Sequence, residues 1–330
     1  MSRLFGIAGV QMTVEAWDMD GTIDKMSDVA MNIRKQMPWV NLVVYHELVV
    51  PGLVQFKTPV DANWWKKNSG PVPGPMTDRF CDLARKTRQW IIPGSMWEIE
   101  DDKMYNTSVV ISPDGDIVAK YRKMFPWLPY EAGTAAGDQF CVFDIPGVGR
   151  FGLCICYDMW YPEVPRTLAW MGAEVIIQPT LTPTSDRPLE LVMAQANALF
   201  NQCYFVSVNG VGTWGGGRST IIDPDGRILQ QAGTNQTFMT EIIDLDHTTR
   251  TREFGTLGLA QTLKQLRDSG QKFPVYGNNG IAEGGFEKLG KLAFQHIEGG
   301  KIGRIGRSDN DEFNWYNTVH EVNKLSPHCP

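Results

Sequence analysis

The stretch FGLCICYDMWYPEVPRTLAW, residues 151–170, decides how the centre of this chain folds. Residues 151–155 form an apolar run that is typical of a buried strand, and residues 162–170 are typical of a helix. Prolines at the start of this helix suit its first turn, where a missing N–H costs nothing, and Glu163 suits the positive end of the helix dipole. The sequence therefore predicts a strand that turns sharply into a helix, with Cys156 at the turn.

Cys156 is a candidate nucleophile, because a thiol beside the positive end of a helix has a lowered pKa and forms more thiolate. A buried structural cysteine is the alternative, which this one residue does not exclude. Cys154 lies inside the apolar run, so we expect it to be a core residue.

The composition describes an ordinary globular chain of 330 residues, of which 42% are hydrophobic and 21% charged. A formal net charge of −6 argues against nucleic acid as a partner, because proteins that bind nucleic acid present a basic face. The sequence shows no signal-peptide pattern and no apolar run of the roughly 18 residues that a membrane span needs. We therefore expect a cytoplasmic protein that binds neither nucleic acid nor membrane.

The six cysteines and five histidines favour neither a disulfide framework nor a metal site. The cysteines are scattered through a long chain, as is typical of a reducing compartment, and no C-x-x-C pair or histidine ligand spacing occurs. Residues 210–215 fit the pattern G-x-G-x-x-G, but they lead into a predicted strand and not into the helix that a dinucleotide site requires. The sequence thus predicts no metal.

Strand-like and helix-like segments alternate through residues 1–250, which we predict to form one domain. The predicted strands cover residues 6–12, 42–47, 91–97, 106–111, 117–122, 175–178, 204–208, 219–222 and 227–230, and further helices cover 23–36, 76–90 and 189–201. Two halves of similar order each end in a hairpin at a Pro-Asp-Gly turn. We predict an α/β fold, a four-layer α-β-β-α sandwich with two mixed sheets inside and helices outside.

Residues 251–330 differ in character from the rest of the chain. They hold one short predicted helix over residues 262–268, a glycine-rich segment at 277–290 and a polar one at 299–311. Such a segment cannot build its own core, so we expect an extended C-terminal arm that packs on the body or on a neighbouring subunit. A disordered tail is the alternative. An arm of this kind predicts a homo-oligomer, a dimer or larger.

Three charged residues outside the opening stretch are candidates for catalysis. Glu47 closes an apolar predicted strand, where α/β folds present functional groups. Lys123 lies in an aromatic loop and could supply a fixed positive charge to an oxyanion, and Glu131 is a second carboxylate further along that loop. Each has a plain alternative, namely a solvated strand end, a surface lysine and a loop residue. His46 lies beside Glu47, and its role is open.

Together, Glu47, the run YRKMFPW around Lys123, Glu131 and the run CICYD around Cys156 resemble the nitrilase (carbon–nitrogen hydrolase) superfamily. The resemblance covers residues 1–250, with the motifs in the expected order, and is closest to the aliphatic amidase and formamidase branch. It implies a catalytic triad of Glu47, Lys123 and Cys156, with Glu131 as a second catalytic or structural glutamate. The residues on either side of Glu47 depart from the pattern of the amidase branch.

The resemblance implies cysteine-dependent hydrolysis of a small carboxamide to the acid and ammonia through a thioacyl-enzyme, without any cofactor. Tyr-Asp after the cysteine, in place of the Trp-Glu of true nitrilases, favours amides over nitriles. The residues that we expect to contact the substrate are Tyr157, Trp127, Tyr130, Trp160, Tyr161 and Thr180. An N-carbamoyl amide or amino acid amidohydrolase, suggested by the run TLTPT from Thr180, stays open, as do a nitrile hydrolase and a catalytically silent interaction protein.

Overall fold

The computed structural model describes residues 2–15, 18–51, 68–128, 131, 133–212, 215–273, 276, 294–298 and 301–305. The chain divides into two compact units, Met1–Pro126 with Thr134–Gln261, and Trp127–Gly133 with Thr262–Pro330. The second unit contains a short helix, α7 (Thr262–Asp268), and an antiparallel hairpin of β16 (Phe294–Glu298) and β17 (Lys301–Ile305).

The first of two large sheets in the first unit has seven strands, ordered β15-β1-β2-β3-β5-β4, with β6 also paired to β5. These strands are β1 (Leu4–Gln11), β2 (Val40–Tyr45), β3 (Trp90–Ile92), β4 (Met96–Glu100), β5 (Lys103–Ile111), β6 (Ile117–Arg122) and β15 (Thr237–Asp244). β1, β2 and β3 run parallel, and all of β2 except Asn41 is buried. A strand covered on both faces needs a continuous apolar run, which LVVY at residues 42–45 supplies.

The second sheet has six strands, ordered β14-β13-β10-β9-β8-β7. They are β7 (Cys141–Ile145), β8 (Gly149–Leu153), β9 (Val175–Thr180), β10 (Tyr204–Asn209), β13 (Thr220–Ile222) and β14 (Ile228–Gln231). β8, β9 and β10 run parallel, and the outer strands pair antiparallel. A separate small ribbon joins β11 (Val211–Gly212) to β12 (Gly215–Gly216).

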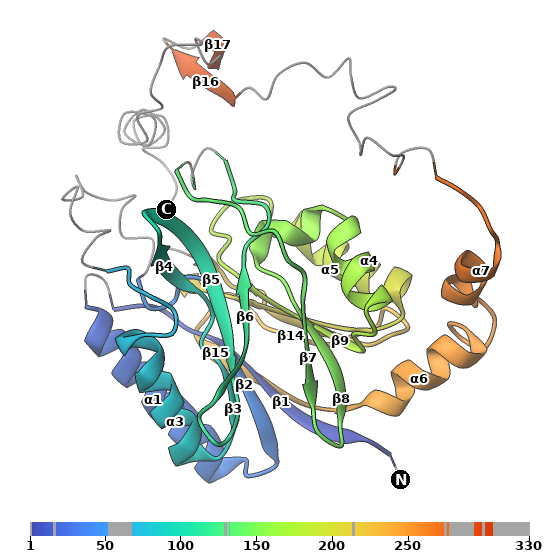
Figure 1. Ribbon diagram of the computed structural model, residues 1–330, viewed down its shortest axis with the longest axis horizontal. Helices are drawn as coiled ribbons and strands as arrows, with labels where there is room; N and C mark the ends of the chain where they lie inside the picture. Colours follow the sequence, from blue (N-terminus) through green and yellow to red (C-terminus); the bar gives the residue numbers. More distant parts are fainter. Residues whose placement is uncertain are drawn as a thin grey trace. The chain divides into compact units, whose positions relative to one another are not determined.

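The two sheets pack face to face, and helices cover their outer faces (Figure 1). The helices are α1 (Met19–Gln36) and α3 (Pro75–Thr87) on the first sheet, and α4 (Glu163–Trp170) and α5 (Arg187–Asn201) on the second. Strand alternation divides the side chains between layers: Val175 and Ile177 of β9 belong to the core between the sheets, while Ile176 packs under the helices. The predicted four-layer α-β-β-α sandwich is confirmed.

Most of the predicted elements are present with boundaries shifted by a few residues. Both Pro-Asp-Gly turns join antiparallel strands, with Gly115 at φ +80° and Gly226 at φ +78°, a conformation that glycine adopts without strain. α6 (Leu245–Phe254) follows β15 and runs through residue 250. The Arg252 guanidinium on α6 donates to the carbonyls of Ala173 and Gln202, which ties this helix to the second sheet's layer.

Three details of the prediction were wrong. The helix predicted over 76–90 ends at Thr87, because Arg88 adopts φ +55° and Trp90 already begins β3. The single strand predicted over 91–97 is two strands, separated by a turn at Gly94 with φ +72°. β7 and β15 were not predicted at all, although β15 completes the first sheet beside β1.

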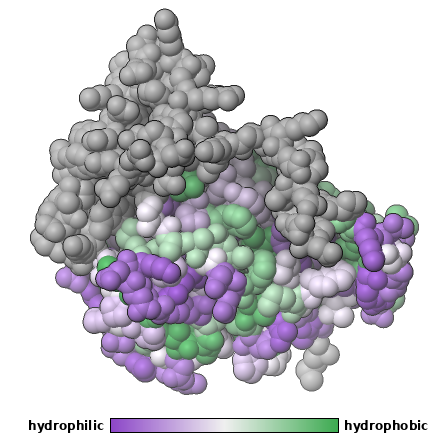
Figure 2. All heavy atoms as spheres, turned by 45° about the horizontal axis from the view of Figure 1, so that its top comes forward, coloured by the Kyte–Doolittle hydropathy of each residue, from purple (hydrophilic) through white to green (hydrophobic). Residues whose placement is uncertain are grey.

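Within the described residues, no helix combines the length and the apolar character that a membrane crossing requires. On the face shown in Figure 2, hydrophobic and hydrophilic residues of the described chain lie side by side. Large hydrophobic side chains are exposed along α5, namely Leu189, Val192, Leu199 and Phe200. The glycine-rich segment 277–290, on which the predicted C-terminal arm rests, lies outside the described residues, so the arm and the domain division at residue 250 stay predictions.

Candidate active site

The candidate site of the first unit lies where strand ends of both sheets meet. Glu47 follows β2 and Lys123 follows β6, which are strands of the first sheet. Cys156 follows β8, and Thr180 ends β9, in the second sheet. The N–H of Glu47 donates to the carbonyl of Thr180 over 3.3 Å, which joins the two sheets at this point.

The Glu47 carboxylate is buried among hydrogen-bond donors. Its Oε1 accepts from the Lys123 ammonium over 2.9 Å and from Asn106 Nδ2 over 2.8 Å. Its Oε2 accepts from the N–H of Leu181 over 2.9 Å. All of these partners donate, so the site is built for an ionised carboxylate, which only accepts. The carboxylate is thus fixed in place, and its negative charge acts on the Cys156 thiol.

Lys123 is a buried cation, with 1% of its surface exposed, and not the surface lysine of the alternative interpretation. Its backbone is held on both sides, by the carbonyl of Asn106 over 2.9 Å and by the N–H of Gly137 over 2.8 Å. A buried ammonium needs a partner of opposite charge, and Glu47 supplies it. The ion pair therefore fixes both predicted residues in one geometry.

Cys156 stands at a strained turn between β8 and the 3-10 helix η2 (Cys156–Trp160). Its φ of +46° lies in the left-handed region, which costs a residue with a Cβ about 1–2 kcal/mol. Gln178 Nε2 donates to the Cys156 carbonyl over 2.9 Å and holds the turn. The thiol is buried at the end of the core between the sheets.

The pKa of the Cys156 thiol is raised well above its usual value, chiefly by burial and then by the negative charge of Glu47. The charge of Lys123 and a hydrogen bond with Thr180 act in the lowering direction and do not outweigh burial. The prediction of a lowered pKa was wrong, because η2 separates Cys156 from α4, which begins only at Glu163. Burial thus favours the neutral thiol form of Cys156.

Asp158 connects the cysteine turn to the lysine loop. Its fully buried carboxylate accepts from the N–H of Ile155 over 2.9 Å, from the Tyr121 hydroxyl over 2.7 Å and from the N–H of Phe125 over 2.9 Å. Tyr121 lies in β6 and Phe125 lies in the loop after Lys123, so the Asp158 carboxylate holds the cysteine turn and the lysine loop together. Burial raises the pKa of Asp158 to about 6.

We expect Asp158→Asn to lower the free energy of unfolding by about 2–3 kcal/mol, measured by urea unfolding at pH 7. All three partners of the carboxylate donate, so the new amide group would face at least one donor and leave it unsatisfied. Tyr121→Phe removes a single hydrogen bond and is the matched control, with an expected loss of about 1–2 kcal/mol. Equal losses in the two variants would contradict the bridging role.

The aromatic residues predicted to contact substrate cluster beside Cys156. Tyr157 packs against Trp160 and Tyr161, with ring centroids 5.8 and 5.4 Å away, and Tyr161 stacks on Phe125 at 3.6 Å. All are partly buried and not fully enclosed in the core. Their contact with substrate stays a prediction, as does that of Thr180, whose buried side chain lies beside the Cys156 thiol.

Glu131 and Trp127 belong to the second unit. The Glu131 carboxylate accepts from the N–H of Trp127 over 2.6 Å, and the Glu131 N–H donates to the Trp127 carbonyl over 2.8 Å. Tyr130 lies outside the described residues. The roles predicted for these three residues therefore stay predictions.

His46 is buried beside Glu47, and its Nδ1 lies 2.8 Å from the Glu47 carbonyl, to which it donates. Burial lowers its pKa from 6.5 to about 4, since a charged imidazolium would lose its solvation there. His46 is thus neutral at pH 7. Its place in the site is to hold the backbone of Glu47, a role that its sequence position did not reveal.

We expect the free energy of unfolding to decrease as the pH is lowered from 6.5 to 4, because of His46. The unfolded chain takes up the proton below pH 6.5 but the folded chain only near pH 4, so unfolding is favoured as pH falls. Asp158 acts in the opposite direction, because its raised pKa makes the folded state bind a proton more readily. The unfolding free energy of the wild type minus that of His46→Gln isolates the histidine and should rise by about 3 kcal/mol from pH 4 to pH 7. Parallel pH curves would contradict it.

Among the described residues, one group has ligand atoms close enough for a metal ion, formed by Asp223, Asp225 and His247. The His247 Nε2 lies 3.0 Å from Asp225, and Asp223 accepts from the N–H groups of Asp225 and Arg227. These contacts show that the two aspartates stabilise the turn between β13 and β14, and that His247 is bonded to this turn.

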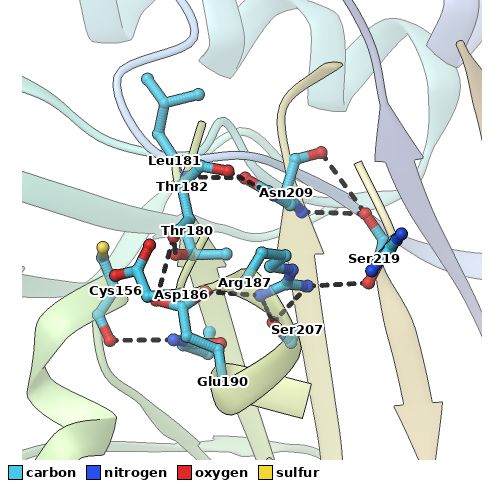
Figure 3. A network of polar contacts seen from close by, with 12 residues as sticks. Cys156, Thr180, Leu181, Thr182, Asp186, Arg187, Glu190, Ser207, Asn209 and Ser219 are labelled. Carbon is cyan, nitrogen blue, oxygen red and sulfur yellow. Dashed lines mark hydrogen bonds and ion pairs between the residues drawn. The ribbon is translucent and has the colours of Figure 1, made fainter. Parts of the chain in front are cut away.

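A polar network behind Cys156 was not predicted from the sequence (Figure 3). Arg187 and Glu190 of α5 form a fully buried ion pair of 2.9 Å. Glu190 also accepts from the Thr182 hydroxyl over 2.9 Å, and Asn209 bonds both the N–H and the carbonyl of Thr182. The only signal for this network in the sequence was an arginine and a glutamate three residues apart, Arg187 and Glu190, near the start of a helix. The same pair is equally typical of a solvated helix end.

This fold is that of the nitrilase superfamily. The chain superimposes on Nit3 of Saccharomyces cerevisiae, a member of branch 10 of that superfamily, with a TM-score of 0.68 and 25% identity over 76% of this chain and 93% of that one. A carbon–nitrogen hydrolase of Helicobacter pylori G27 gives a TM-score of 0.70 and 24% identity over 82% of this chain and 99% of that one. An amidase of Nesterenkonia gives 0.64 and 22%, over 76% and 95%.

The chain belongs to the carbon–nitrogen hydrolase family, whose model matches residues 6–253. Curated relatives include proteins named formamidase from Bacillus cereus (strain B4264) and from Bacillus thuringiensis (strain Al Hakam). Each is 30% identical over 223 residues, which is 66% of this chain and 66% of the relative. The match thus spans about two thirds of the length of these relatives.

Proposed function

We propose that this protein hydrolyses a small carboxamide to its acid and ammonia through a thioacyl-enzyme on Cys156. The observation that supports it best is the contact of Glu47 with Lys123 next to the Cys156 turn. Family membership and the formamidase relatives favour amide hydrolysis. Nothing in this reaction calls for a cofactor.

In the first half of the proposed reaction, Glu47 takes the thiol proton as the Cys156 sulfur attacks the amide carbon. A raised thiol pKa makes this transfer necessary, since little thiolate exists at rest. The charge on the carbonyl oxygen is stabilised by the Lys123 ammonium and by the N–H of Tyr157, which lies in the first turn of η2. Glu47 then donates its proton to the departing nitrogen, and ammonia leaves.

In the second half, Glu47 takes a proton from water as the water oxygen attacks the thioester carbon. The C–S bond breaks, the sulfur recovers a proton, and the acid leaves. Glu47 thus serves in turn as base and acid, which requires it to be fixed. The hydrogen bonds from Asn106 and Leu181 hold it in place.

The proposal is tested by measuring ammonia release from formamide, acetamide, propionamide, longer amides, N-carbamoyl amino acids and nitriles. Release from a small amide, together with a mass-trapped acyl group on Cys156, is the expected result. Carbon dioxide formed along with ammonia from an N-carbamoyl substrate would favour the carbamoyl amidohydrolase. Turnover of nitriles alone would favour a nitrilase, and no turnover of any compound a silent interaction protein.

We also propose that the protein is a homo-oligomer, a dimer or larger. Exposed Leu189, Val192 and Phe200 share one side of α5, where water contact with apolar side chains is unfavourable. Sedimentation equilibrium of the wild type and of Val192→Glu tests it. A wild-type monomer would contradict it, and dissociation of the variant would support α5 as the contact.

A further inference from the structure

The peptide group that joins Glu47 to Leu48 is held at both of its polar ends. Its carbonyl accepts from His46 Nδ1 over 2.8 Å, and its N–H donates to the hydroxyl oxygen of Ser95 over 3.0 Å. The N–H of Glu47 itself donates to the carbonyl of Thr180 over 3.3 Å. The backbone around the proposed base is therefore fixed from both sheets, and Ser95 contributes from the turn between β3 and β4.

Leu48 adopts a strained backbone conformation directly after the proposed base. Its φ of +47° lies in the left-handed region, which a bulky side chain rarely enters. Its side chain is 2% exposed and packs with Trp97 and Leu181, and the N–H of Leu181 donates to the Glu47 carboxylate. Strain of this kind persists only where neighbouring contacts hold it, and it gathers at functional sites. The hydrogen bond to Ser95 is such a contact.

Ser95 is itself fixed by the first sheet. It is fully buried and follows Gly94, whose φ of +72° and lack of a side chain let the turn lie directly against the carbonyl of His46. The hydroxyl of Ser108 on β5 donates to the carbonyl of Gly94 over 2.6 Å. The acceptor that meets the Leu48 N–H is thus held by two neighbouring strands.

We propose that Ser95 is a positioning residue, which holds the Glu47–Leu48 peptide in its left-handed arrangement and so keeps the Glu47 carboxylate in place for proton transfer with Cys156. The inference rests on the proposed function, in which Glu47 is the base. Rotation of Leu48 toward the extended region would turn this peptide group and displace Glu47. Ser95 acts through the backbone alone, and its hydroxyl keeps its proton throughout the reaction.

A buried serine that merely supports the fold is the alternative, and a matched control separates it from a positioning residue. Ser95→Ala leaves the buried Leu48 N–H without its acceptor, which costs stability in either case. Ser112 is also buried, and its hydroxyl accepts from the N–H groups of Asp114 and Asp116 in the turn between β5 and β6. Ser112→Ala therefore removes the same kind of contact from a turn that holds no proposed catalytic residue.

Steady-state ammonia release from the best amide substrate gives the first readout. Ser95→Ala should lower kcat about 30-fold and change KM less than about threefold, because a displaced base slows the chemical step without removing a contact that binds the amide. Ser112→Ala should keep both constants while it lowers the urea midpoint of unfolding by a similar amount. In the Glu47→Gln background, Ser95→Ala should lower turnover by less than a further factor of about two, because the group that Ser95 places is already gone.

Hydrogen exchange of the Leu48 amide, followed by mass spectrometry, gives a readout that needs no substrate. We expect exchange at this amide to be about tenfold or more faster in Ser95→Ala than in the wild type, because its acceptor is lost. Ser112→Ala should leave it unchanged. If Ser95→Ala does not fold, Ser95→Cys keeps the shape with a weaker acceptor and should show the same changes in kcat and in exchange to a smaller extent.

Faster exchange at Leu48 with an unchanged kcat in Ser95→Ala would overturn the proposal, because the peptide would then be released without effect on the base. An equal fall of turnover in the wild-type and Glu47→Gln backgrounds would overturn it as well, since Ser95 would then not act through Glu47. Either result in an active enzyme leaves the proposed function standing. A wild type that releases no ammonia from any amide refutes the proposed function instead, and exchange at Leu48 still decides whether Ser95 holds the peptide.

Discussion

Cys156→Ala is expected to lower ammonia release at least about 10⁴-fold, as removal of a nucleophile does in other hydrolases with covalent intermediates. The variant should unfold within about 1 kcal/mol of the wild type, because the side chain that is lost is small and lies at the edge of the core. Steady-state ammonia assays and urea unfolding measure the two quantities. Turnover above a trace would remove Cys156 from the reaction.

Two matched variants separate chemistry from folding. Cys154→Ala changes the neighbouring cysteine, whose side chain packs under α4 and α5, and should keep turnover. Cys156→Gly loses turnover like the alanine variant but relieves the φ of +46°, so it should be about 1 kcal/mol more stable than Cys156→Ala. A glycine variant that is less stable would show that the turn is not strained.

Glu47→Gln is expected to lower turnover about 10³-fold and the free energy of unfolding by about 3–5 kcal/mol. The loss of turnover follows from removal of the base. The loss of stability follows from the contacts: Lys123, Asn106 and the N–H of Leu181 all donate, and the buried ammonium would lose the counter-charge that Glu47 supplies. Ammonia assays and urea unfolding at pH 7 test both. Asp114→Asn, in the exposed pair with Arg88, should change stability by less than about 1 kcal/mol.

The double variant Glu47→Gln with Lys123→Met distinguishes the two effects. Removing both charges takes the ammonium away together with the carboxylate that it pairs with, so the double variant should be more stable than the sum of the single changes predicts by about 2 kcal/mol or more. It should nevertheless be as inactive as Glu47→Gln. Additive losses of stability would mean that the ion pair is not coupled, and recovery of activity would contradict both catalytic roles.

The short motifs of the sequence were enough to identify the residues that the structure brings together. Glu47 and Cys156 each follow a strand that is apolar in sequence, and Lys123 follows the returning strand of a predicted hairpin. Strand ends of one sandwich meet at one edge. The family and the four layers could be predicted for the same reason, because periodicity and motif order are local properties. The catalytic roles of these residues rest on the experiments above.

Contacts between distant segments could not be predicted. Asp158 was read only as a clue to the substrate, yet it holds the lysine loop through Phe125, and this needs the packing of β6 against the cysteine turn. Glu190 looked like an ordinary helix residue, because nothing local shows that α5 buries its first turn. The prediction of a lowered thiol pKa was wrong for a related reason. Burial depends on the whole fold, and its effect on the pKa outweighs that of the dipole of α4, which begins only at Glu163.

The pairing of β1 with β15 has a consequence for synthesis of the protein. Leu4–Gln11 pairs with Thr237–Asp244, so the sheet that contains β1 is complete only after β15 has been synthesised. All three proposed catalytic residues have been translated by residue 156, well before that partner exists. A ribosome-bound chain that ends short of residue 237 should therefore carry all three proposed catalytic residues and still expose the unpaired edge of β1. We expect such an intermediate to be prone to aggregation and to need a chaperone.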